Sequence, residues 1–371
     1  MILITLTLQN FRSYAKKTFA FSPQTTLIVG PNTAGKTNIL EAIMFCVTGK
    51  SFRADQDREA IRWGSELSAI SLGTRDKSCL PRNSGQVLRG SGQELSANHD
   101  NTKLELFITQ GEVQGAKAPL KKYLVNGVPR GQVDFVGNLR AVLFWPEHLE
   151  LVTDSPSLRR RYLDSVLVQV DREYRRNLMS YERGLRQRNR LLDLINEGKA
   201  ERPQLLFWDQ LLIKAGGYIT DKRGEYIDFV NSYQLSAISY QIQYDKSVIS
   251  ESRLEQYKDE EVGAKATLVG PHRDDFTIFK DERELSKYGS RGEQRLAVLW
   301  LKLAELSYVE KEAGDRPVLL LDDIFSELDE KYRHLVLDVI GKQQTIITSA
   351  EDNMVDLVRR AKGMQPMIIQ L

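Results

Sequence analysis

Cysteine and histidine are scarce in this chain. Its 371 residues include two cysteines, Cys46 and Cys79, and four histidines. Two cysteines exclude a disulfide framework and a paired CxxC metal knuckle. The histidines are scattered, without the HExxH spacing or another ligand spacing. We therefore expect neither a disulfide-stabilised fold nor a transition-metal site.

Long apolar runs and a strong net charge are also absent. No stretch of 18 apolar residues occurs, which argues against a membrane-spanning helix. The start, MILITLTLQNF, alternates apolar and other residues and lacks the basic flank and apolar run of a signal peptide. The sequence thus favours a cytoplasmic protein without a membrane partner. The net charge of +2 does not by itself indicate a nucleic-acid partner, so a DNA argument depends on where the charge lies.

Apolar periodicity predicts a mixed α/β chain. Alternation from Ile2 to Leu8 and the apolar run 26–29 predict strands, and residues 38–47 carry the spacing of a helix. Further strands are expected at 67–72, 104–108 and 122–125, the last ending in the turn Asn126-Gly127. Residues 73–101 are rich in Gly, Ser and Asn, which favours a mobile loop.

The middle of the chain has helical spacing. Apolar residues recur every three or four positions from Ser157 onward and predict one helix to about Asn196, roughly 60 Å long at 1.5 Å per residue. We expect a second helix over about 204–229 and a strand over 238–244. The last third returns to strand–helix alternation: a helix after Arg291, a strand at Val318–Leu321, a helix from Lys331 and a strand at Thr345–Thr348. We predict a split α/β head of residues 1–154 plus 262–371, with a helical arm domain of residues 155–261 inserted in it.

A phosphate-binding loop follows the second apolar run. The pattern GxxxxGK[ST] is matched in full by Gly30, Pro31, Asn32, Thr33, Ala34, Gly35, Lys36 and Thr37. Such a loop turns backbone N–H groups around a phosphate, while Lys36 reaches its oxygens and the Thr37 hydroxyl can bind Mg²⁺. Asn38 completes the candidate nucleotide site. The alternative is a Gly-rich turn that merely caps a helix.

Two carboxylates end a buried-type strand near the C-terminus. The run Val318–Leu321 is followed by Asp322 and Asp323. We expect Asp322 to reach the Mg²⁺ shell and Asp323 to orient or deprotonate a water as the catalytic residue. The alternative is an apolar strand that ends in Asp at an ordinary turn.

The spacing of these motifs predicts a split head. Lys36 and Asp322 lie 286 positions apart (322 − 36), so a large insertion separates two halves that fold together. Among phosphate-loop proteins, such heads belong to the ABC and SMC-like group, in which a second subunit meets the γ-phosphate through a signature segment. The candidate signature residues are Ser290, Gly292 and Glu293, and Ser326 and Asp329 are the candidate D-loop. The alternative in both cases is ordinary helix capping.

Basic residues concentrate on the predicted arm. Residues 157–199 carry eleven arginines and lysines against six acids. Arg186, Arg188 and Arg190 are the candidate DNA contacts, since arginines neutralise phosphates and release counterions. The alternative is a solvated helix face with i,i+4 ion pairs.

Five segments together resemble the RecF family. They are Asn10-Phe11-Arg12-Ser13-Tyr14, the phosphate loop, Pro146-Glu147 with Ser155-Pro156 and Arg159–Asp164, Gly270–Asp275, and Leu321–Asp329. The last part of the third segment reads RRRYLD and the fourth segment reads GPHRDD, and generic ABC heads lack both. The resemblance covers essentially the whole chain. Asp154 stands where the family usually has Gly, and Arg291 occupies a signature position that is Gly in most ABC proteins.

The resemblance implies a function. A RecF-like protein is an SMC-like ATPase head without a long coiled coil, which uses ATP and Mg²⁺, forms an ATP-dependent homodimer and binds DNA. It also implies nucleoid association and work with RecO and RecR in loading RecA recombinase at gapped DNA or single-strand/double-strand junctions. Arg12 would lie near the nucleotide. The rivals are an SMC-like or ABC-type ATPase that does not act on DNA, and a non-hydrolysing ATP-bound DNA scaffold.

Overall fold

The computed structural model describes residues 1–76, 101–234, 239–327, 330–350, 353–363 and 365–371. The chain divides into two compact units, residues 1–146 with 313–371, and residues 147–312. These boundaries differ from the predicted division at 154/155 and 261/262. Which residues form the functional head therefore stays a prediction.

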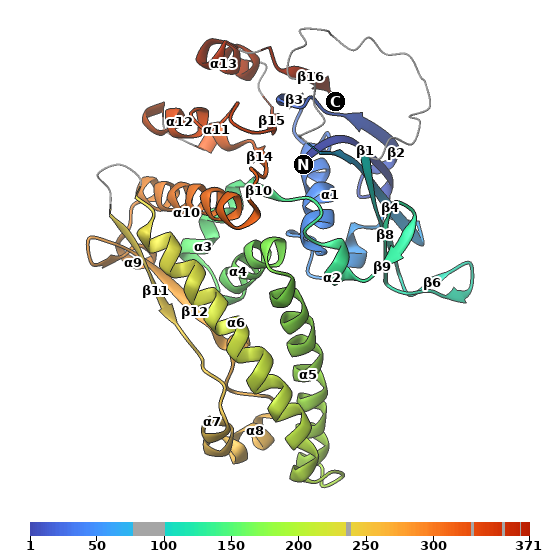
Figure 1. Cartoon of the computed structure of the whole chain (residues 1–371), viewed down its shortest axis with the longest axis vertical. Coiled ribbons are helices and arrows are strands. Elements are labelled where there is room, and N and C mark those ends of the chain that lie inside the picture. Colours follow the sequence, from blue (N-terminus) through green and yellow to red (C-terminus); the bar gives the residue numbers. More distant parts are fainter. Residues whose placement is uncertain (77–100, 235–238, 328–329, 351–352, 364) are drawn as a thin grey trace. The chain divides into compact units, whose positions relative to one another are not determined.

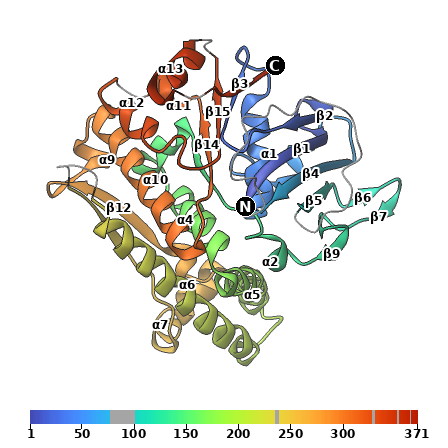
Figure 2. The ribbon, with the colours of Figure 1, turned by 45° about the horizontal axis from the view of Figure 1, so that its top comes forward.

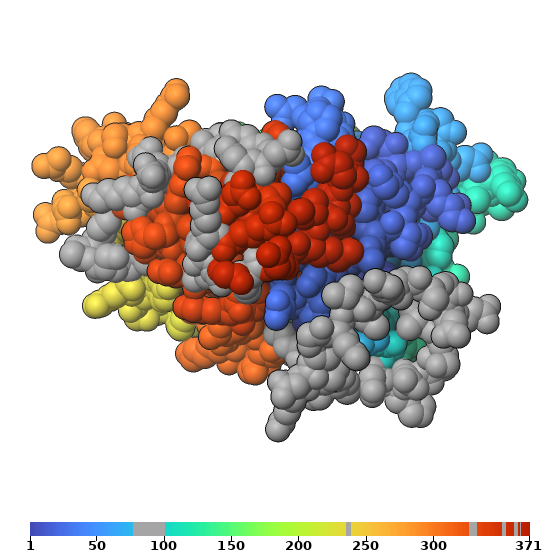
Figure 3. Space-filling model, turned by 90° about the horizontal axis from the view of Figure 1, so that it is seen from above, coloured from blue at the N-terminus to red at the C-terminus, as the bar shows by residue number. Residues whose placement is uncertain are grey.

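The first unit holds two sheets with one helix between them (Figures 1 and 2). The parallel sheet has the order β10-β14-β15-β3-β16. Its strands are β10 (Ala141–Phe144), β14 (Val318–Asp322), β15 (Thr345–Ser349), β3 (Thr25–Val29) and β16 (Met367–Gln370). The first four are buried along their whole length, as expected of strands covered on both faces. In the space-filling view the dark red C-terminal residues lie against the blue N-terminal ones, in agreement with the pairing of β16 with β3 (Figure 3).

The second sheet of this unit is antiparallel, with the order β2-β1-β4-β5-β8-β9. Its strands are β1 (Ile2–Phe11), β2 (Tyr14–Ala20), β4 (Leu67–Arg75), β5 (Asn101–Thr109), β8 (Lys121–Val125) and β9 (Val128–Arg130). Helix α1 (Lys36–Thr48) packs against strands of both sheets, so nearly all its side chains are buried. The predicted strands and the Asn126-Gly127 turn are confirmed. Residues 77–100, most of the predicted loop, lie outside the described residues, and Gly73–Arg75 belong to β4.

Short elements complete the first unit. They are the 3₁₀ turn Asp57–Ala60, the ribbon β6 (Glu112–Val113) and β7 (Ala116–Lys117), and the helices α2 (Gln132–Phe135), α11 (Ile324–Glu327), α12 (Glu330–Leu337) and α13 (Asn353–Lys362).

The second unit is mostly helical. Its helices are α3 (Glu150–Thr153), α4 (Pro156–Val170), α5 (Arg172–Asn196), α6 (Leu206–Ser232), α7 (Glu251–Gln256), α8 (Lys258–Ala264), α9 (Leu285–Tyr288) and α10 (Arg291–Ala313). Strands β11 (Tyr240–Asp245), β12 (Asp275–Lys280) and β13 (Arg283–Glu284) form a small antiparallel sheet. The 3₁₀ turns are Pro146–Leu149, Arg202–Leu205 and Pro271–Arg273.

Helices α5 and α6 form the arm and run side by side (Figure 1). A Cβ atom on Gly184 of α5 would lie 2.7 Å from the Leu211 Cδ2 atom of α6, so a larger residue here would require the Leu211 side chain to move. The prediction of one helix over 157–196 is wrong, because the chain breaks at Asp171. There the Asp171 carboxylate accepts hydrogen bonds from the amides of Glu173 and Tyr174 and starts α5 as a new helix.

Candidate functional site

The phosphate-loop sequence lies between β3 and α1, as its mechanism requires. Gly35 immediately precedes α1 and has a φ of 94°, a conformation that favours glycine. The Lys36 ammonium donates hydrogen bonds to the carbonyl oxygens of Gly30 at 2.8 Å and Pro31 at 2.9 Å. An ammonium has three N–H donors, so these two bonds leave one for a phosphate oxygen. The loop is therefore folded around its own lysine.

Residues of the β1–β2 turn support the loop from one side. The Tyr14 hydroxyl donates to the Gly35 carbonyl oxygen at 3.2 Å, and a Cβ on Gly35 would come within 2.9 Å of the Tyr14 oxygen. Burial raises the pKa of Tyr14 to about 12. Glycine at position 35 is thus required by both backbone conformation and space.

Arg12 is held beside α1 by a buried carboxylate. Glu41 is fully buried, and its two oxygens accept from Arg12 Nη2 at 2.6 Å and Nε at 2.9 Å. This bidentate pair is further supported by the Ser51 hydroxyl, which donates to Glu41 at 2.6 Å. Sequence reasoning missed Glu41, although an acid within the apolar run of α1 was a usable signal. The geometry by itself gives Arg12 a structural role.

Asn38 belongs to the same polar network. Its Oδ1 accepts from Arg53 at 3.0 Å, and its Nδ2 donates to the Ser13 hydroxyl at 3.1 Å. Both groups of the amide are therefore engaged by neighbouring side chains, and Arg53 is a further residue that the sequence did not indicate.

The two aspartates stand at the end of β14. Asp322 is buried, and its Oδ1 accepts from the Thr348 hydroxyl of β15 at 2.6 Å. Oδ2 accepts no hydrogen bond from the described residues, so it is the oxygen free to meet a cation. Asp323 has a φ of 49°, and its amide donates to the Thr348 hydroxyl at 3.2 Å. This left-handed turn, which Asp tolerates better than most residues, ends the strand and separates the two carboxylates.

The parallel register brings the loop and the aspartates to one sheet edge. Asp322 lies opposite Thr348, and Ser349 lies opposite Val29, the residue before the loop. In addition, the Gly30 amide donates to the Ser349 carbonyl at 3.3 Å. Thr37 and Asp322 could hold Mg²⁺ here, since hydroxyl and carboxylate oxygens suit that ion. The described part of the chain has no cluster of three or more metal-ligating side chains, so phosphate oxygens and water would have to complete the shell.

The candidate signature residues form a helix cap in the second unit. The Ser290 hydroxyl accepts from the Glu293 amide at 3.3 Å, and the Glu293 carboxylate accepts from the Ser290 amide at 2.9 Å. This reciprocal pair is a capping box at the start of α10. Hydrogen bonds from Lys280 and then from Ser290 lower the pKa of Glu293 to about 2. The capping alternative is therefore realised, Gly292 lies in the first turn, and a role toward a second subunit stays a prediction.

The candidate D-loop is only partly described. Ser326 lies in α11, and Asp329 lies outside the described residues.

The three candidate DNA-binding arginines differ in environment. Arg186 and Arg190 are exposed on α5, whereas Arg188 is buried. Arg188 pairs with Asp209 at 2.6 Å and Glu261 at 2.7 Å, and donates to the Thr267 hydroxyl at 2.9 Å. Arg188 is therefore withdrawn as a DNA contact, because its guanidinium is already occupied inside the protein. Arg186 and Arg190 remain candidates.

These features define a class of protein. The phosphate loop and the acidic end of β14 lie at one edge of a parallel sheet, and the helical arm separates these two parts of the sequence. This arrangement is that of an ATPase head of the split ABC and SMC type. None of the described helices has the length and apolar character needed to cross a membrane.

Comparison with known proteins identifies the family. The RecF/RecN/SMC N-terminal domain family matches residues 2–368. The chain is 34% identical to the DNA replication and repair protein RecF of Lachnoclostridium phytofermentans, over 94% of this chain and 92% of that protein. It is 36% identical to the RecF protein of Roseiflexus castenholzii, over 96% and 95%. The chain belongs to the RecF family.

Solved structures agree with this assignment. The recombination mediator protein RecF-ATPrS in the RecFOR pathway is similar with a TM-score of 0.81 and 28% identity, over 100% of this chain and 96% of that one. The corresponding RecF-ATP structure gives a TM-score of 0.80 and 29% identity, over 94% and 92%.

Proposed function

We propose that this chain is an ATP-binding, ATP-hydrolysing DNA-repair protein that dimerises on ATP. The observation that carries the proposal is the phosphate loop beside Asp322 at one edge of the parallel sheet. The chain is similar to the solved RecF-ATP and RecF-ATPrS structures, and this similarity supports ATP as the ligand here. Gly30 to Asn38 would surround the phosphates, with Arg12 held nearby by Glu41.

The acidic strand end supports slow hydrolysis. Thr37 and Asp322 would hold Mg²⁺, which would supply positive charge to neutralise the phosphate oxygens of ATP. Asp322 is oriented for this by Thr348. Asp323 would orient or deprotonate the attacking water, and its backbone turn is fixed by the bond from its amide to Thr348.

A second copy of the chain would complete the site. Ser290 and Gly292 at the start of α10 would meet the γ-phosphate held by the partner, Glu293 of the same signature segment would hold Ser290 in place, and Ser326 and Asp329 would form the D-loop. A helix N-terminus carries partial positive charge, which favours such a contact. The Ser290–Glu293 cap gives this terminus a fixed conformation before any partner arrives.

The DNA-related part of the proposal rests on family membership. RecF relatives are named as replication and repair proteins and as recombination mediators in the RecFOR pathway. We propose that this chain binds duplex, gapped or junction DNA, acts with RecO and RecR in loading RecA, and works in the cytoplasm at the nucleoid. Exposed Arg186 and Arg190 would contact phosphates.

ATP turnover measured with and without DNA tests this function. We expect slow hydrolysis that duplex and gapped DNA accelerate, together with DNA binding that requires ATP. Hydrolysis unaffected by either DNA would favour an ATPase that does not act on DNA. Tight ATP binding without turnover, with DNA bound, would favour a scaffold that uses ATP only as a ligand.

A further inference from the structure

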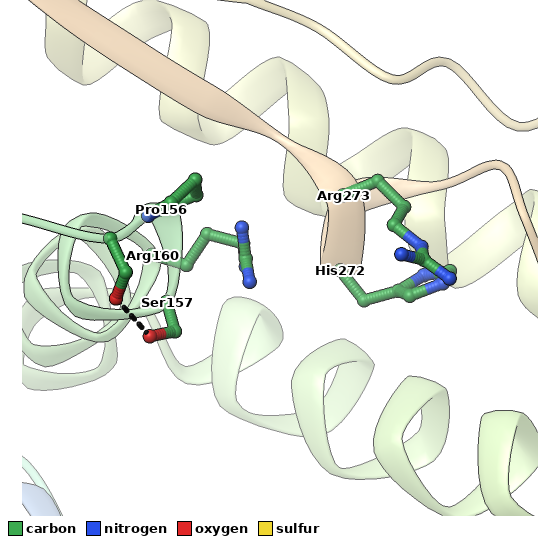
Figure 4. A pocket seen from close by; sticks show the side chains of 6 residues that line it. Pro156, Ser157, Arg160, His272 and Arg273 are labelled. Atoms are coloured by element: carbon green, nitrogen blue, oxygen red, sulfur yellow. Dashed lines mark hydrogen bonds between the residues drawn. The ribbon is translucent and has the colours of Figure 1, made fainter.

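Two family-specific segments meet in a basic pocket of the second unit. The cavity has a volume of about 460 Å³ and is lined by Ser155, Pro156, Ser157, Arg160, His272 and Arg273. The first four come from the start of α4 and the last two from the turn before β12. Figure 4 shows the Arg160 side chain extending from α4 toward the side where His272 and Arg273 lie. None of the lining residues is acidic.

The nearby aspartates are already neutralised by other arginines. The buried Arg223 donates to Asp164 at 2.8 Å and to Asp274 at 3.0 Å. Arg159 makes a bidentate pair with Asp275, at 2.6 and 2.9 Å. These ion pairs engage the carboxylates of Asp164, Asp274 and Asp275.

Arg160 and Arg273 are left with backbone acceptors only, among the described residues. Arg160 donates to the Asp274 carbonyl oxygen at 2.8 Å, and Arg273 makes a long contact of 3.4 Å with the Thr267 carbonyl oxygen. Burial, and next the charge of Arg223, lower the pKa of Arg160, and the charges of Asp275, Asp164 and Asp274 offset this only in part. An anionic ligand stabilises a cation in this state more than it stabilises a cation that already pairs with a carboxylate.

His272 forms a neutral wall. Its Nε2 lies 3.0 Å from the Thr267 carbonyl, which can only accept, so Nε2 carries the proton. Its Nδ1 then accepts from the Tyr181 hydroxyl at 2.7 Å. Burial lowers the pKa of His272 to about 4, so the ring adds no charge at neutral pH.

The start of α4 adds a third source of positive potential. Its first turn contains no acidic residue, and Ser155 makes no capping bond to the backbone. Instead the Ser155 and Ser157 hydroxyls bond to each other at 2.7 Å at the pocket wall (Figure 4). Hydroxyls, a helix N-terminus and two arginines are the groups that proteins use to hold phosphate.

We propose that this pocket binds a phosphate group, supplied by the backbone of a DNA strand or by free phosphate. The DNA form rests on the proposed function, whereas the free-phosphate form does not. Arg160 and Arg273 would bind the phosphate oxygens directly, and Ser155 and Ser157 would donate to them from the start of α4. The site is separate from the phosphate loop in sequence and belongs to the other compact unit.

DNA affinity tests the first source. Anisotropy of a labelled duplex with a single-stranded tail is measured with ATP at salt concentrations from about 50 to 200 mM. Arg273→Glu should weaken binding about tenfold at the lower salt and reduce the slope of log K against log salt by about 1, the loss expected for one phosphate. Arg160→Gln should act in the same direction. Lys214→Glu, which reverses an exposed charge of α6, is the matched control and should leave the slope unchanged.

Binding of inorganic phosphate tests the second source. The phosphorus NMR line width of inorganic phosphate is measured while wild type or Arg273→Glu is added, without nucleotide or DNA. The phosphate loop is intact in both, so a difference reports the pocket. Thermal unfolding within about 2 °C of wild type would show that exposed Arg273 was replaced without loss of folding.

The two arms give distinct outcomes. A changed DNA slope assigns the pocket to a DNA phosphate, and a changed phosphate titration alone assigns it to free phosphate. If neither changes in Arg273→Glu, or if Lys214→Glu changes both equally, the pocket is not a phosphate site. Wild-type protein that fails to bind DNA would refute the proposed function, and the phosphate titration would still decide the pocket.

Discussion

Replacing Arg188 by alanine should destabilise the protein without directly removing a DNA contact. The Arg188 and Glu261 side chains are 3% and 1% exposed, so the change leaves a carboxylate buried without its cation. Breaking a buried pair from one side costs about 3–5 kcal/mol. The Leu268 amide still donates to Glu261 at 2.8 Å, and Asp209 is partly exposed and can be hydrated. We therefore expect a loss near the lower limit, about 3 kcal/mol.

Urea and thermal unfolding measure this loss. A change of about 3 kcal/mol lowers the melting temperature by roughly 6–12 °C in a unit of this size. Arg186→Ala is the matched control, because it removes an exposed arginine two positions away and should change stability by less than about 0.5 kcal/mol. Glu261→Gln added to Arg188→Ala should recover about 1–2 kcal/mol, since the buried charge is then gone.

The two variants should separate stability from DNA binding. Arg186→Ala should reduce the salt dependence of DNA affinity without changing stability. Arg188→Ala should lower stability but leave the salt dependence unchanged when DNA binding is assayed well below its melting temperature. The reasoning is refuted if Arg188→Ala unfolds like wild type. It is also refuted if the second substitution at Glu261 recovers nothing.

Three further predictions concern hydrolysis, dimerisation and pH. Asp323→Asn should bind ATP normally but hydrolyse it far more slowly, since an amide cannot accept a proton from water; normal turnover would remove Asp323 from this role. In sedimentation with ATP, Ser290→Arg should bind ATP yet stay monomeric, while Ser290→Ala, which loses the hydroxyl and a cap of about 1 kcal/mol but adds no bulk, should still dimerise, more weakly than wild type; a dimeric Ser290→Arg would disprove contact in trans. For His272, the folded-state pKa of about 4 lies below the usual 6.5, so its stabilising contribution is complete above pH 6.5 and is lost as pH falls toward 4. Chemical unfolding across this range should show a shallower decline for His272→Gln, and identical pH profiles would contradict the assignment.

The sequence predicted the loop and the acidic strand end at one edge of the parallel sheet because their signals are local. Buried parallel strands give continuous apolar runs, and the phosphate loop requires glycine and lysine at fixed spacing, as Gly35 and Lys36 show. Family membership, inferred from short ordered segments, is confirmed over nearly the full chain. The roles of the individual site residues stay predictions.

Features that depend on distant residues were not predictable in the same way. The break at Asp171 preserves the three-to-four spacing of apolar residues, so periodicity alone cannot reveal it. The burial of Arg188 depends on Asp209 and Glu261, which no local pattern connects with it. Likewise, the basic pocket joins segments near residues 155–160 and 272–273, and only the fold brings them together.

The affinity of Lys36→Ala for ATP tests the central claim most directly. The Lys36 ammonium is held by two loop carbonyls at the place where phosphate would bind. Removing a charge-assisted contact from a desolvated site costs on the order of 3 kcal/mol, or roughly 100-fold in affinity. Fluorescence titration with a labelled ATP analogue and Mg²⁺, on protein whose unfolding matches wild type, should show this loss. An affinity within about twofold of wild type would contradict the assignment of Gly30 to Asn38 as the nucleotide site.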